Sequence, residues 1–229
     1  TVHLTCNFLY LCTGYYEYEH GYTPEWPGFD NYTGTIVHPQ RWPVDLDYSG
    51  KKVLVIGSGA TAVTLVPAMA ETASHVTMLQ RSPTYVISMP AGDKIANTLR
   101  AVLPPKAAYA LTRWKNVLRQ MFFYTLSRKK PEVMKNLIAK GVKNEVGEEC
   151  LEKHFRPKYN PWDQRLCLVP NSDLFASIRE GRSSIVTGEI DTFTDKGLRM
   201  KTGEESDTDM IVTATGFNLK IMDGHELIV

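Results

Sequence analysis

The sequence lacks the features that would assign it to several common classes of protein. Its four cysteines, Cys6, Cys12, Cys150 and Cys167, include no C-x-x-C pair. A redox dithiol is therefore missing, which argues against a pyridine-nucleotide disulfide reductase. No signal peptide and no apolar run long enough to span a bilayer is present. The cysteines are therefore expected to be reduced thiols of a cytoplasmic protein, buried as small hydrophobic residues.

An excess of charge of either sign is also missing. The 229 residues carry a net charge of +1, so nothing indicates a nucleic-acid partner, and no metal site is predicted. Hydrophobic residues make up 43% of the chain, which is enough to build one large or two small domains. The chain has no initiator methionine and begins within an apolar stretch. We therefore expect a fragment of a longer protein.

The middle of the chain carries a pattern typical of dinucleotide-binding folds. Residues 53–56 form an apolar run suited to a strand that is buried on both faces of a parallel sheet. Gly57 then allows a tight turn, Gly59 lets the backbone approach a pyrophosphate, and Ala62 takes the third small position. The helix that begins here directs its free amides at the phosphates. The predicted cofactor contacts of this turn are Gly57, Ser58, Gly59, Thr61 and Ala62.

The end of the next strand, residues 75–79, indicates which dinucleotide is bound. An NAD site usually places an acidic residue there to bind the ribose 2′-hydroxyl, whereas this chain continues with Gln80, Arg81 and Ser82. A cation and a hydroxyl suit a 2′-phosphate, so Arg81 and Ser82 predict selectivity for NADPH. The alternative is that Arg81 is only a solvated charge at the end of a strand.

Two apolar stretches that each contain a Thr-Gly corner bracket this unit. They are residues 3–16 and residues 209–217. A strand with glycine at its carboxyl end is where an α/β sheet turns its backbone towards a ligand. The bracketing predicts that one domain is inserted into another, and that the chain returns to the first sheet at Met210. The predicted ligand contacts of the two corners are Thr13, Gly14, Thr215 and Gly216.

A proline- and aromatic-rich loop, residues 17–47, contains the most specific motif of the chain. Tyr32-x-Gly34-x-x-x-His38-x-x-x-Trp42-Pro43 resembles the fingerprint F-x-G-x-x-x-H-x-x-x-W-P of type I Baeyer-Villiger monooxygenases, with tyrosine in place of phenylalanine. The stretches RSPTYVISMPAGDKI, YNPWDQRLCLVPNSDLF and DMIVTATGFN resemble the ethionamide-activating branch of that family. The resemblance covers essentially the whole chain.

The resemblance implies an enzyme that uses FAD and NADPH. NADPH would reduce the flavin, and the reduced flavin would activate oxygen for insertion beside a ketone carbonyl or for oxidation of a thioether. Arg165 aligns with the family arginine that lies over the flavin and stabilises the peroxyflavin. His38 and Trp42 lie in the fingerprint, and we expect His38 to act by positioning and gating. Gln164 replaces a lysine that helps to hold the 2′-phosphate in many relatives.

Two further interpretations stay open. The FAD fingerprint near the family's N-terminus is absent from this sequence. The chain could therefore be a non-catalytic NADPH-binding module, or part of a flavin monooxygenase that oxygenates nitrogen and sulfur. For Arg165 the alternative role is a salt bridge to Asp163 or Asp173. The oligomeric state stays open as well.

The predicted fold is a Rossmann-like α/β NADPH-binding domain inserted into part of a second, FAD-binding α/β domain. Residues 1–50 would end the FAD-binding domain and supply the fingerprint linker. Residues 51–209 would form the NADPH-binding domain, with a helical insertion at about 91–155, and residues 210–229 would return to the FAD-binding domain. Three short strands, residues 184–186, 190–193 and 198–201, are expected to pair antiparallel and to cover the NADPH sheet.

The helical insertion has a pronounced pattern of its own. Pro104-Pro105 and Lys130-Pro131 bound its main helix, and apolar residues recur in it at helical spacing from Leu111 to Phe122. No acidic residue occurs between Lys94 and Pro131. The favoured interpretation is a subdomain that packs its apolar stripe into a core. The alternative is a peripheral membrane contact through residues 107–130.

Overall fold

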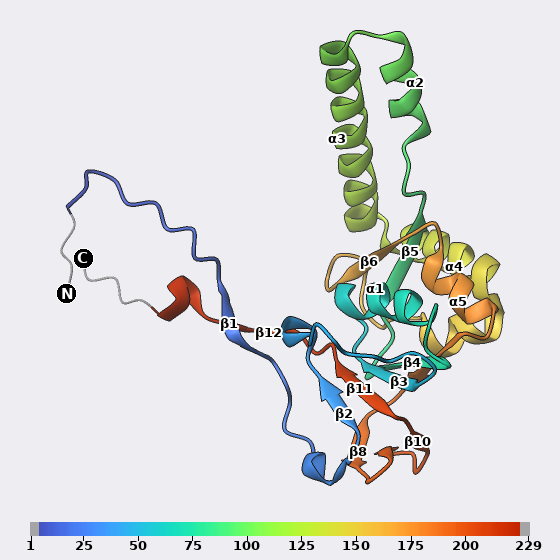
Figure 1. Cartoon of the computed structure of the whole chain (residues 1–229). Helices are drawn as coiled ribbons and strands as arrows, with labels where there is room; N and C mark the ends of the chain where they lie inside the picture. The colour runs from blue at the N-terminus through green and yellow to red at the C-terminus, as the bar shows by residue number, and fades with distance from the viewer. Residues whose placement is uncertain (1–4, 225–229) are drawn as a thin grey trace.

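A parallel β-sheet forms the centre of the molecule, and the fold is mixed α/β as predicted. The computed structural model describes residues 5–224. All neighbouring strands of this sheet pair in parallel (Figure 1). Within the described residues, no helix is long and apolar enough to cross a membrane. The strands in spatial order are β2 (Thr35–Val37), β11 (Met210–Thr213), β3 (Lys52–Ile56), β4 (His75–Gln80) and β7 (Ser183–Thr187).

Two apolar layers cover the faces of the sheet, which explains why β3 is an unbroken apolar run. Side chains alternate between the faces of a strand, so Val53 and Val55 of β3 pack with α1 (Ala60–Met69), on the same face as α5 (Asp173–Arg179). Leu54 and Ile56 pack on the other face, against Phe193 and Leu198 of the strands that follow β7. A strand buried on both faces needs apolar side chains at every position.

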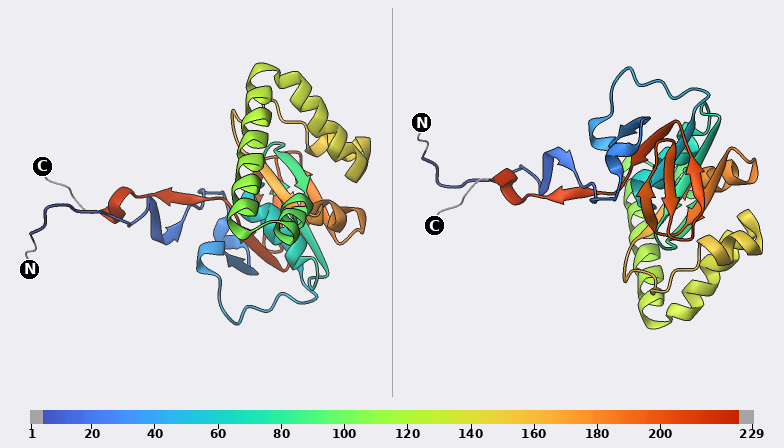
Figure 2. Two further views of the ribbon diagram at one scale, coloured as in Figure 1. Left: turned by 90° about the horizontal axis from the view of Figure 1, so that it is seen from above. Right: turned by 90° about the horizontal axis from the view of Figure 1, so that it is seen from below.

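An antiparallel sheet forms the second layer. It contains β8 (Ile190–Phe193), β9 (Gly197–Met200) and β10 (Glu205–Asp207), and in the view from below it lies in front of the parallel sheet (Figure 2). The prediction of antiparallel covering strands is confirmed for β8 and β9. It is wrong for residues 184–186, which belong to β7 and pair in parallel with β4. A short β-branched run is compatible with either kind of pairing, so its composition did not decide between them.

The boundary predicted at Met210 is wrong. β11 begins at Met210 and lies inside the parallel sheet, between β2 and β3. β2 also adds to this sheet, although it lies in a stretch that was expected to be a loop. That stretch also contains two 3₁₀ turns, Phe29–Asn31 and Pro39–Arg41. A three-residue strand is too short to leave a clear periodic signal, and the neighbours of β11 lie far away in the sequence.

Two antiparallel strands form a ribbon that extends away from the sheet (Figure 1). They are β1 (Tyr16–Gly21) and β12 (Phe217–Leu219), and a 3₁₀ turn, Ile221–Gly224, follows β12. Residues 5–15 precede β1, contain no strand and are mostly exposed, so the buried strand expected at residues 3–16 is not observed where the structure describes this stretch. Cys6 and Cys12 are exposed as well, which corrects the expectation that they are buried. The stretch has no partner strands within the described residues.

The helical insertion lies between the two strands of a second parallel sheet, β5 (Tyr85–Met89) and β6 (Leu166–Pro170). Between these strands the chain forms α2 (Lys94–Val102), α3 (Pro105–Lys129) and α4 (Pro131–His154), so the predicted insertion and the predicted ends of its main helix are confirmed. α4 bends at Gly147, where φ is 84°. α2 and α3 form a hairpin that projects from the body of the molecule, whereas α4 packs beside α5 (Figure 1).

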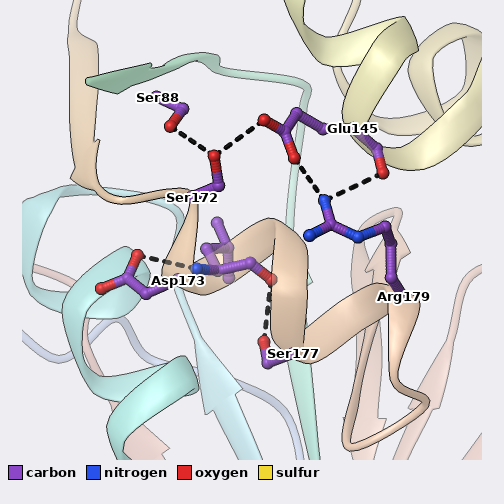
Figure 3. Close-up of polar contacts among 7 residues, drawn as sticks. Ser88, Glu145, Ser172, Asp173, Ser177 and Arg179 are labelled. Carbon is purple, nitrogen blue, oxygen red and sulfur yellow. Dashed lines mark hydrogen bonds and ion pairs between the residues drawn. The ribbon is translucent and has the colours of Figure 1, made fainter. Parts of the chain in front are cut away.

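A polar cluster fixes α4 to the start of α5 (Figure 3). Ser172 shares a hydrogen bond of 2.6 Å with Ser88 and donates one of 2.7 Å to the carboxylate of Glu145 on α4. Arg179 forms an ion pair with the same carboxylate. Ser172 has a φ of 60°, a left-handed conformation that is uncommon without glycine. Because the carboxylate has two partners on the β6–α5 segment, it holds this turn and α4 together.

Candidate functional site

Several of the predicted site residues meet at one edge of the parallel sheet. The carboxyl ends of parallel strands lie at the same edge, and loops at this edge form the ligand sites of open α/β sheets. Each of these residues lies within three residues of the end of a strand. His38 follows β2, the glycine turn follows β3, Arg81 and Ser82 follow β4, and Gly216 is three residues after β11.

The glycine turn has the geometry that a dinucleotide phosphate requires. Gly57 has a φ of 136°, and a Cβ atom there would lie 2.3 Å from the backbone oxygen of Ala214, so only glycine fits. A Cβ atom on Gly59 would meet nothing within 4 Å. The space above Gly59 is therefore open to a ligand. Ala62 is completely buried where α1 packs on the sheet, as the pattern predicts, and Thr61 is half-buried.

The N-terminus of α1 suits an anion. Its N-cap is Gly59, so no side chain caps the first amides, and no acidic residue occurs in the first turn. The free amides and the positive end of the helix dipole remain available to a phosphate. This arrangement fits NADPH.

Arg165 lies beside the same turn. Its Nε donates to Thr84 Oγ1 over 3.5 Å, and its Nη2 donates to Ser58 Oγ over 3.4 Å. The hydroxyl groups of Ser58 and Thr84 share a hydrogen bond of 2.8 Å. Arg165 and Thr84 can meet because they immediately precede β6 and β5, which pair in parallel. A guanidinium therefore lies next to the N-terminus of α1.

The salt bridges considered for Arg165 are absent from the described residues. Asp163 forms its ion pair with Arg128, at 2.5 Å. Asp173 accepts a hydrogen bond from the amide of Leu174, at the start of α5. Arg165 therefore has no carboxylate partner within 4 Å in the described structure, and its charge is available to a bound anion.

Arg81 and Ser82 are both exposed just beyond the end of β4, where a 2′-phosphate would lie. Lys201 forms an ion pair with Glu189 and holds the pKa of that carboxyl below its ordinary value, and the charge of Arg81 adds a smaller contribution. Glu189 is therefore the acidic group near Arg81, and Lys201 already compensates its charge. Gln164 is exposed and lies next to Arg165.

Gln80, the residue before Arg81, is buried and forms hydrogen bonds within the protein. Gln80 is 1% exposed and donates to the backbone oxygen of His154 and to Thr187 Oγ1, over 2.7 and 2.9 Å. His154 shares a hydrogen bond of 2.7 Å with the same hydroxyl. Burial, followed by the charge of Lys153, lowers the pKa of His154 to about 4. This network anchors the end of β4, and its side chains are not available to a ligand.

His38 of the fingerprint follows β2 and contacts Gly216, the residue before β12, so it links the sheet to the ribbon. Its Nδ1 accepts a hydrogen bond from the amide of Gln40, so the proton of the neutral ring lies on Nε2, which donates to the oxygen of Gly216 over 3.1 Å. Gly21 of β1 packs against the ring so closely that a Cβ atom there would lie 1.9 Å from His38 Cε1. Thr215 donates to the oxygen of Tyr22 over 2.5 Å. These contacts fix the base of the ribbon.

The aromatic residues of the fingerprint have structural partners. Tyr32 is buried, and its hydroxyl donates to the backbone oxygen of Thr208 over 3.0 Å. Burial, followed by the charge of Asp209, raises the pKa of Tyr32 to about 12. Trp42 packs edge-on against Tyr48, beside the core below α1. In the structure Trp42 therefore makes packing contacts with the core.

The two Thr-Gly corners are not brought together. In the ribbon, Gly21 pairs with Phe217 and Tyr16 pairs with Leu219. Gly216 is therefore at the end of the ribbon nearest the sheet, whereas Gly14 is beyond the opposite end. Thr13 accepts a hydrogen bond from the hydroxyl of Tyr18. The described residues thus contain one dinucleotide turn, and they do not form a second site that would fit FAD.

Some functional neighbours were missed at the level of sequence. Thr84 and Ser58 hold the guanidinium of Arg165. Ser58 was predicted as a cofactor contact, whereas Thr84 was not singled out. Its only signal is its position immediately before an apolar strand, which many threonines share. The Gly21–His38 contact likewise depends on two segments that have no spacing relation.

Comparison with known proteins identifies the family to which the chain belongs. The chain belongs to the flavin-binding monooxygenase-like family, whose model matches residues 5–225. It is 53% identical over 223 residues to the FAD-containing monooxygenase EthA of Mycobacterium tuberculosis. This match covers 96% of the chain and 46% of EthA, so the chain spans about half the length of this relative. The family resemblance noted in the sequence is confirmed.

Solved structures have the same fold. The crystal structure of OTEMO in complex with FAD and NADP matches with a TM-score of 0.67 and 21% identity, over 91% of the chain and 47% of OTEMO. The ε-caprolactone-bound structure of cyclohexanone monooxygenase matches with a TM-score of 0.67 and 19% identity, over 92% of the chain and 48% of that structure. These neighbours are Baeyer-Villiger monooxygenases.

Proposed function

We propose that this chain is the NADPH-binding part of a flavoprotein that carries out Baeyer-Villiger oxidation and sulfoxidation. The observation that carries the proposal is the open N-terminus of α1 with Arg165 beside it. The glycine turn would hold the pyrophosphate of NADPH through the free amides of α1. Arg81 and Ser82, exposed at the end of β4, would hold the 2′-phosphate.

FAD is assigned to the remainder of a longer protein. The described residues do not form a second dinucleotide site, whereas the relatives are about twice as long and are named as FAD-containing enzymes. When bound, the two cofactors supply the hydride and the activation of oxygen. The ribbon of β1 and β12 would connect the NADPH-binding domain to the flavin-binding domain. His38 and Thr215 would set the angle at which the ribbon leaves the sheet.

Arg165 would stabilise negative charge on the reacting oxygen atoms. A guanidinium is always charged and offers several donors in a fixed plane, so it can stabilise an anion without giving up a proton. The hydroxyl groups of Ser58 and Thr84 hold it at 3.4–3.5 Å and so limit its motion. The contact with Ser58 also supports a second role, in which Arg165 binds the pyrophosphate of NADPH.

A single substitution distinguishes the two roles. In the complete protein, Arg165→Ala should retain NADPH and FAD but lose product formation about 100- to 1000-fold, because a preorganised donor is missing in the transition state. NADPH consumption would then end in hydrogen peroxide, which is measured beside the ester or sulfoxide. Arg165→Lys should rescue only partly, since it keeps the charge without the planar fork.

The two roles of Arg165 predict different results. A loss of NADPH affinity with normal coupling of the remaining turnover would assign Arg165 to cofactor binding. Product formation close to that of the parent protein would reject both roles. Ser58→Ala and Thr84→Val serve as companions, because they remove the groups that hold the guanidinium and leave its charge in place.

The proposed substrates are molecular oxygen and a small apolar ketone or thioether. The ketone is supported by the neighbouring cyclohexanone monooxygenase, whose structure contains a lactone. We also propose a cytoplasmic location, for which the four free cysteines are the support, because unpaired thiols persist in a reducing compartment. Assays of NADPH oxidation with a series of cyclic ketones and aryl thioethers test the substrate class.

A further inference from the structure

The α2–α3 hairpin presents an apolar surface that nothing among residues 5–224 covers. α3 has 25 residues, which corresponds to about 37 Å at a rise of ~1.5 Å per residue. It stands away from the parallel sheet and contacts the body mainly near its C-terminal end (Figure 1). Its only buried residues are Ala108 and Ser127. Most of the helix surface therefore faces solvent.

One side of α3 carries a continuous apolar stripe. Its members recur at spacings of three and four residues, which places them on one face of a helix. The core packing that the sequence favoured for this stripe is wrong for the described structure, because every member is more than half exposed. Apolar surface of this kind usually marks an interaction site. We call it the α3 stripe; its members are Leu111, Trp114, Leu118, Met121 and Phe122.

The charge of the hairpin restricts what can cover the stripe. Residues 94–130 contain nine lysines and arginines and no acidic residue. Lys115 forms an ion pair with Asp93, and Arg128 forms one with Asp163. The other seven cations have no ion pair within 4 Å in the part of the chain that the structure describes. The occupant must therefore be apolar and must also bring negative charge.

We propose that the α3 stripe docks on the surface of an anionic lipid bilayer. Helices that lie in the membrane interface combine lysine and arginine with tryptophan, phenylalanine and leucine on the apolar side, as α3 does. Trp114 has the amphipathic ring that prefers the headgroup level. A second copy of the same surface would bring seven further unpaired cations, so repulsion opposes self-association through this face. An apolar substrate dissolved in the bilayer would then be close to the enzyme.

Vesicle binding by the complete FAD-loaded protein tests this proposal without using its activity. Co-sedimentation is measured with phosphatidylcholine vesicles and with an equal mixture of phosphatidylcholine and phosphatidylglycerol. The mixed vesicles should bind at least tenfold more tightly, and added salt should weaken that binding. A juxtamembrane cation contributes about fivefold to binding, so the double variant Arg113→Glu, Arg119→Glu should lose about 25-fold or more.

The apolar component is tested by the double variant Trp114→Ser, Phe122→Ser, which should lose binding at least tenfold although its charge is unchanged. Both positions are exposed, so the fold should tolerate the change. Matched controls are Lys140→Glu and Val44→Ser, an exposed cation on α4 and an exposed apolar residue in the loop before β3, and they should bind like the parent.

Three results would overturn the proposal. One is failure of the complete protein to bind mixed vesicles, which would mean that another part of that protein covers the α3 stripe. Another is equal binding to both kinds of vesicle. The third is a dimer that the Trp114→Ser, Phe122→Ser variant disrupts, which would assign the surface to a second copy of the chain.

Discussion

At the scale of single residues, Arg81 is the residue that we propose selects NADPH over NADH. A charge-assisted hydrogen bond contributes about 1.5–3 kcal/mol, so Arg81→Ala should weaken NADPH binding roughly 10- to 100-fold and leave NADH almost unchanged. Dissociation constants for both nucleotides, measured by calorimetry, check this. Equal losses for the two nucleotides would reject the role of Arg81 in selectivity.

A substitution at Gly59 should weaken the binding of both nucleotides, unlike Arg81→Ala. Its φ of −81° is allowed for any residue, and a Cβ atom there would meet nothing within 4 Å, so Gly59→Leu should fold normally. The new side chain would occupy the space in which the pyrophosphate is expected. Both nucleotides should therefore bind at least tenfold more weakly, with no change in melting temperature. Unchanged binding of both would move the phosphate site away from this turn.

His154 makes the stability of the chain depend on pH. Its pKa is about 4 in the folded protein, against an ordinary value of 6.5, because burial disfavours the charged ring. The unfolded chain therefore binds a proton below about pH 6.5 that the folded chain accepts only near pH 4. The stabilising contribution is complete above pH 6.5 and is lost as the pH falls towards 4, at about 1.4 kcal/mol per pH unit.

The corresponding experiment is chemical unfolding of the chain between pH 4 and pH 7. His154→Gln should flatten the fall in unfolding free energy across this interval, because glutamine takes up no proton. His20→Gln, an exposed position on β1, should keep the fall as it is in the parent. A variant at position 154 with the same slope as the parent would show that another group is responsible.

At the scale of elements, the ribbon and the sheet are joined through His38. Because its Nε2 donates to Gly216 and its Nδ1 accepts from Gln40, both ring nitrogens are used in positioning. In the complete protein we expect His38→Ala to slow turnover several-fold without shifting its pH optimum, since the ring transfers no proton. Gly21→Ala should resemble it, because the added Cβ displaces the ring. A new limb in the pH–rate profile would instead indicate acid–base chemistry.

At the scale of the whole molecule, cofactor content follows from the number of dinucleotide turns. The described residues contain one such turn, and the corners at Gly14 and Gly216 are separated by the ribbon. The 229-residue chain, expressed alone, should therefore bind NADPH, purify without stoichiometric FAD and oxidise no ketone. A flavin absorption spectrum and calorimetry with NADPH measure this. Stoichiometric flavin together with turnover would place the FAD site within this chain.

Local pattern alone determined part of the fold and of the site. The strand–turn–helix unit of β3 and α1 was predictable because an apolar run, the glycine spacing and the start of a helix all lie within a few residues of one another. The ends of α3 were predictable because proline fits the first turn of a helix and disfavours helical conformation in the residue before it, so Pro105 and Pro131 indicate where α3 begins and ends.

Tertiary structure alone decided which distant segments meet. β11 lies between β2 and β3, and its hydrogen bonds join residues more than 150 positions apart, so no periodicity could assign it to this sheet. Arg165 meets Thr84 because β5 and β6 align in parallel, and not because of any spacing in the chain. The helical period of the α3 stripe was visible in the sequence, but its exposure was not. Periodicity defines a face of a helix, whereas the packing of the whole chain decides whether anything covers it.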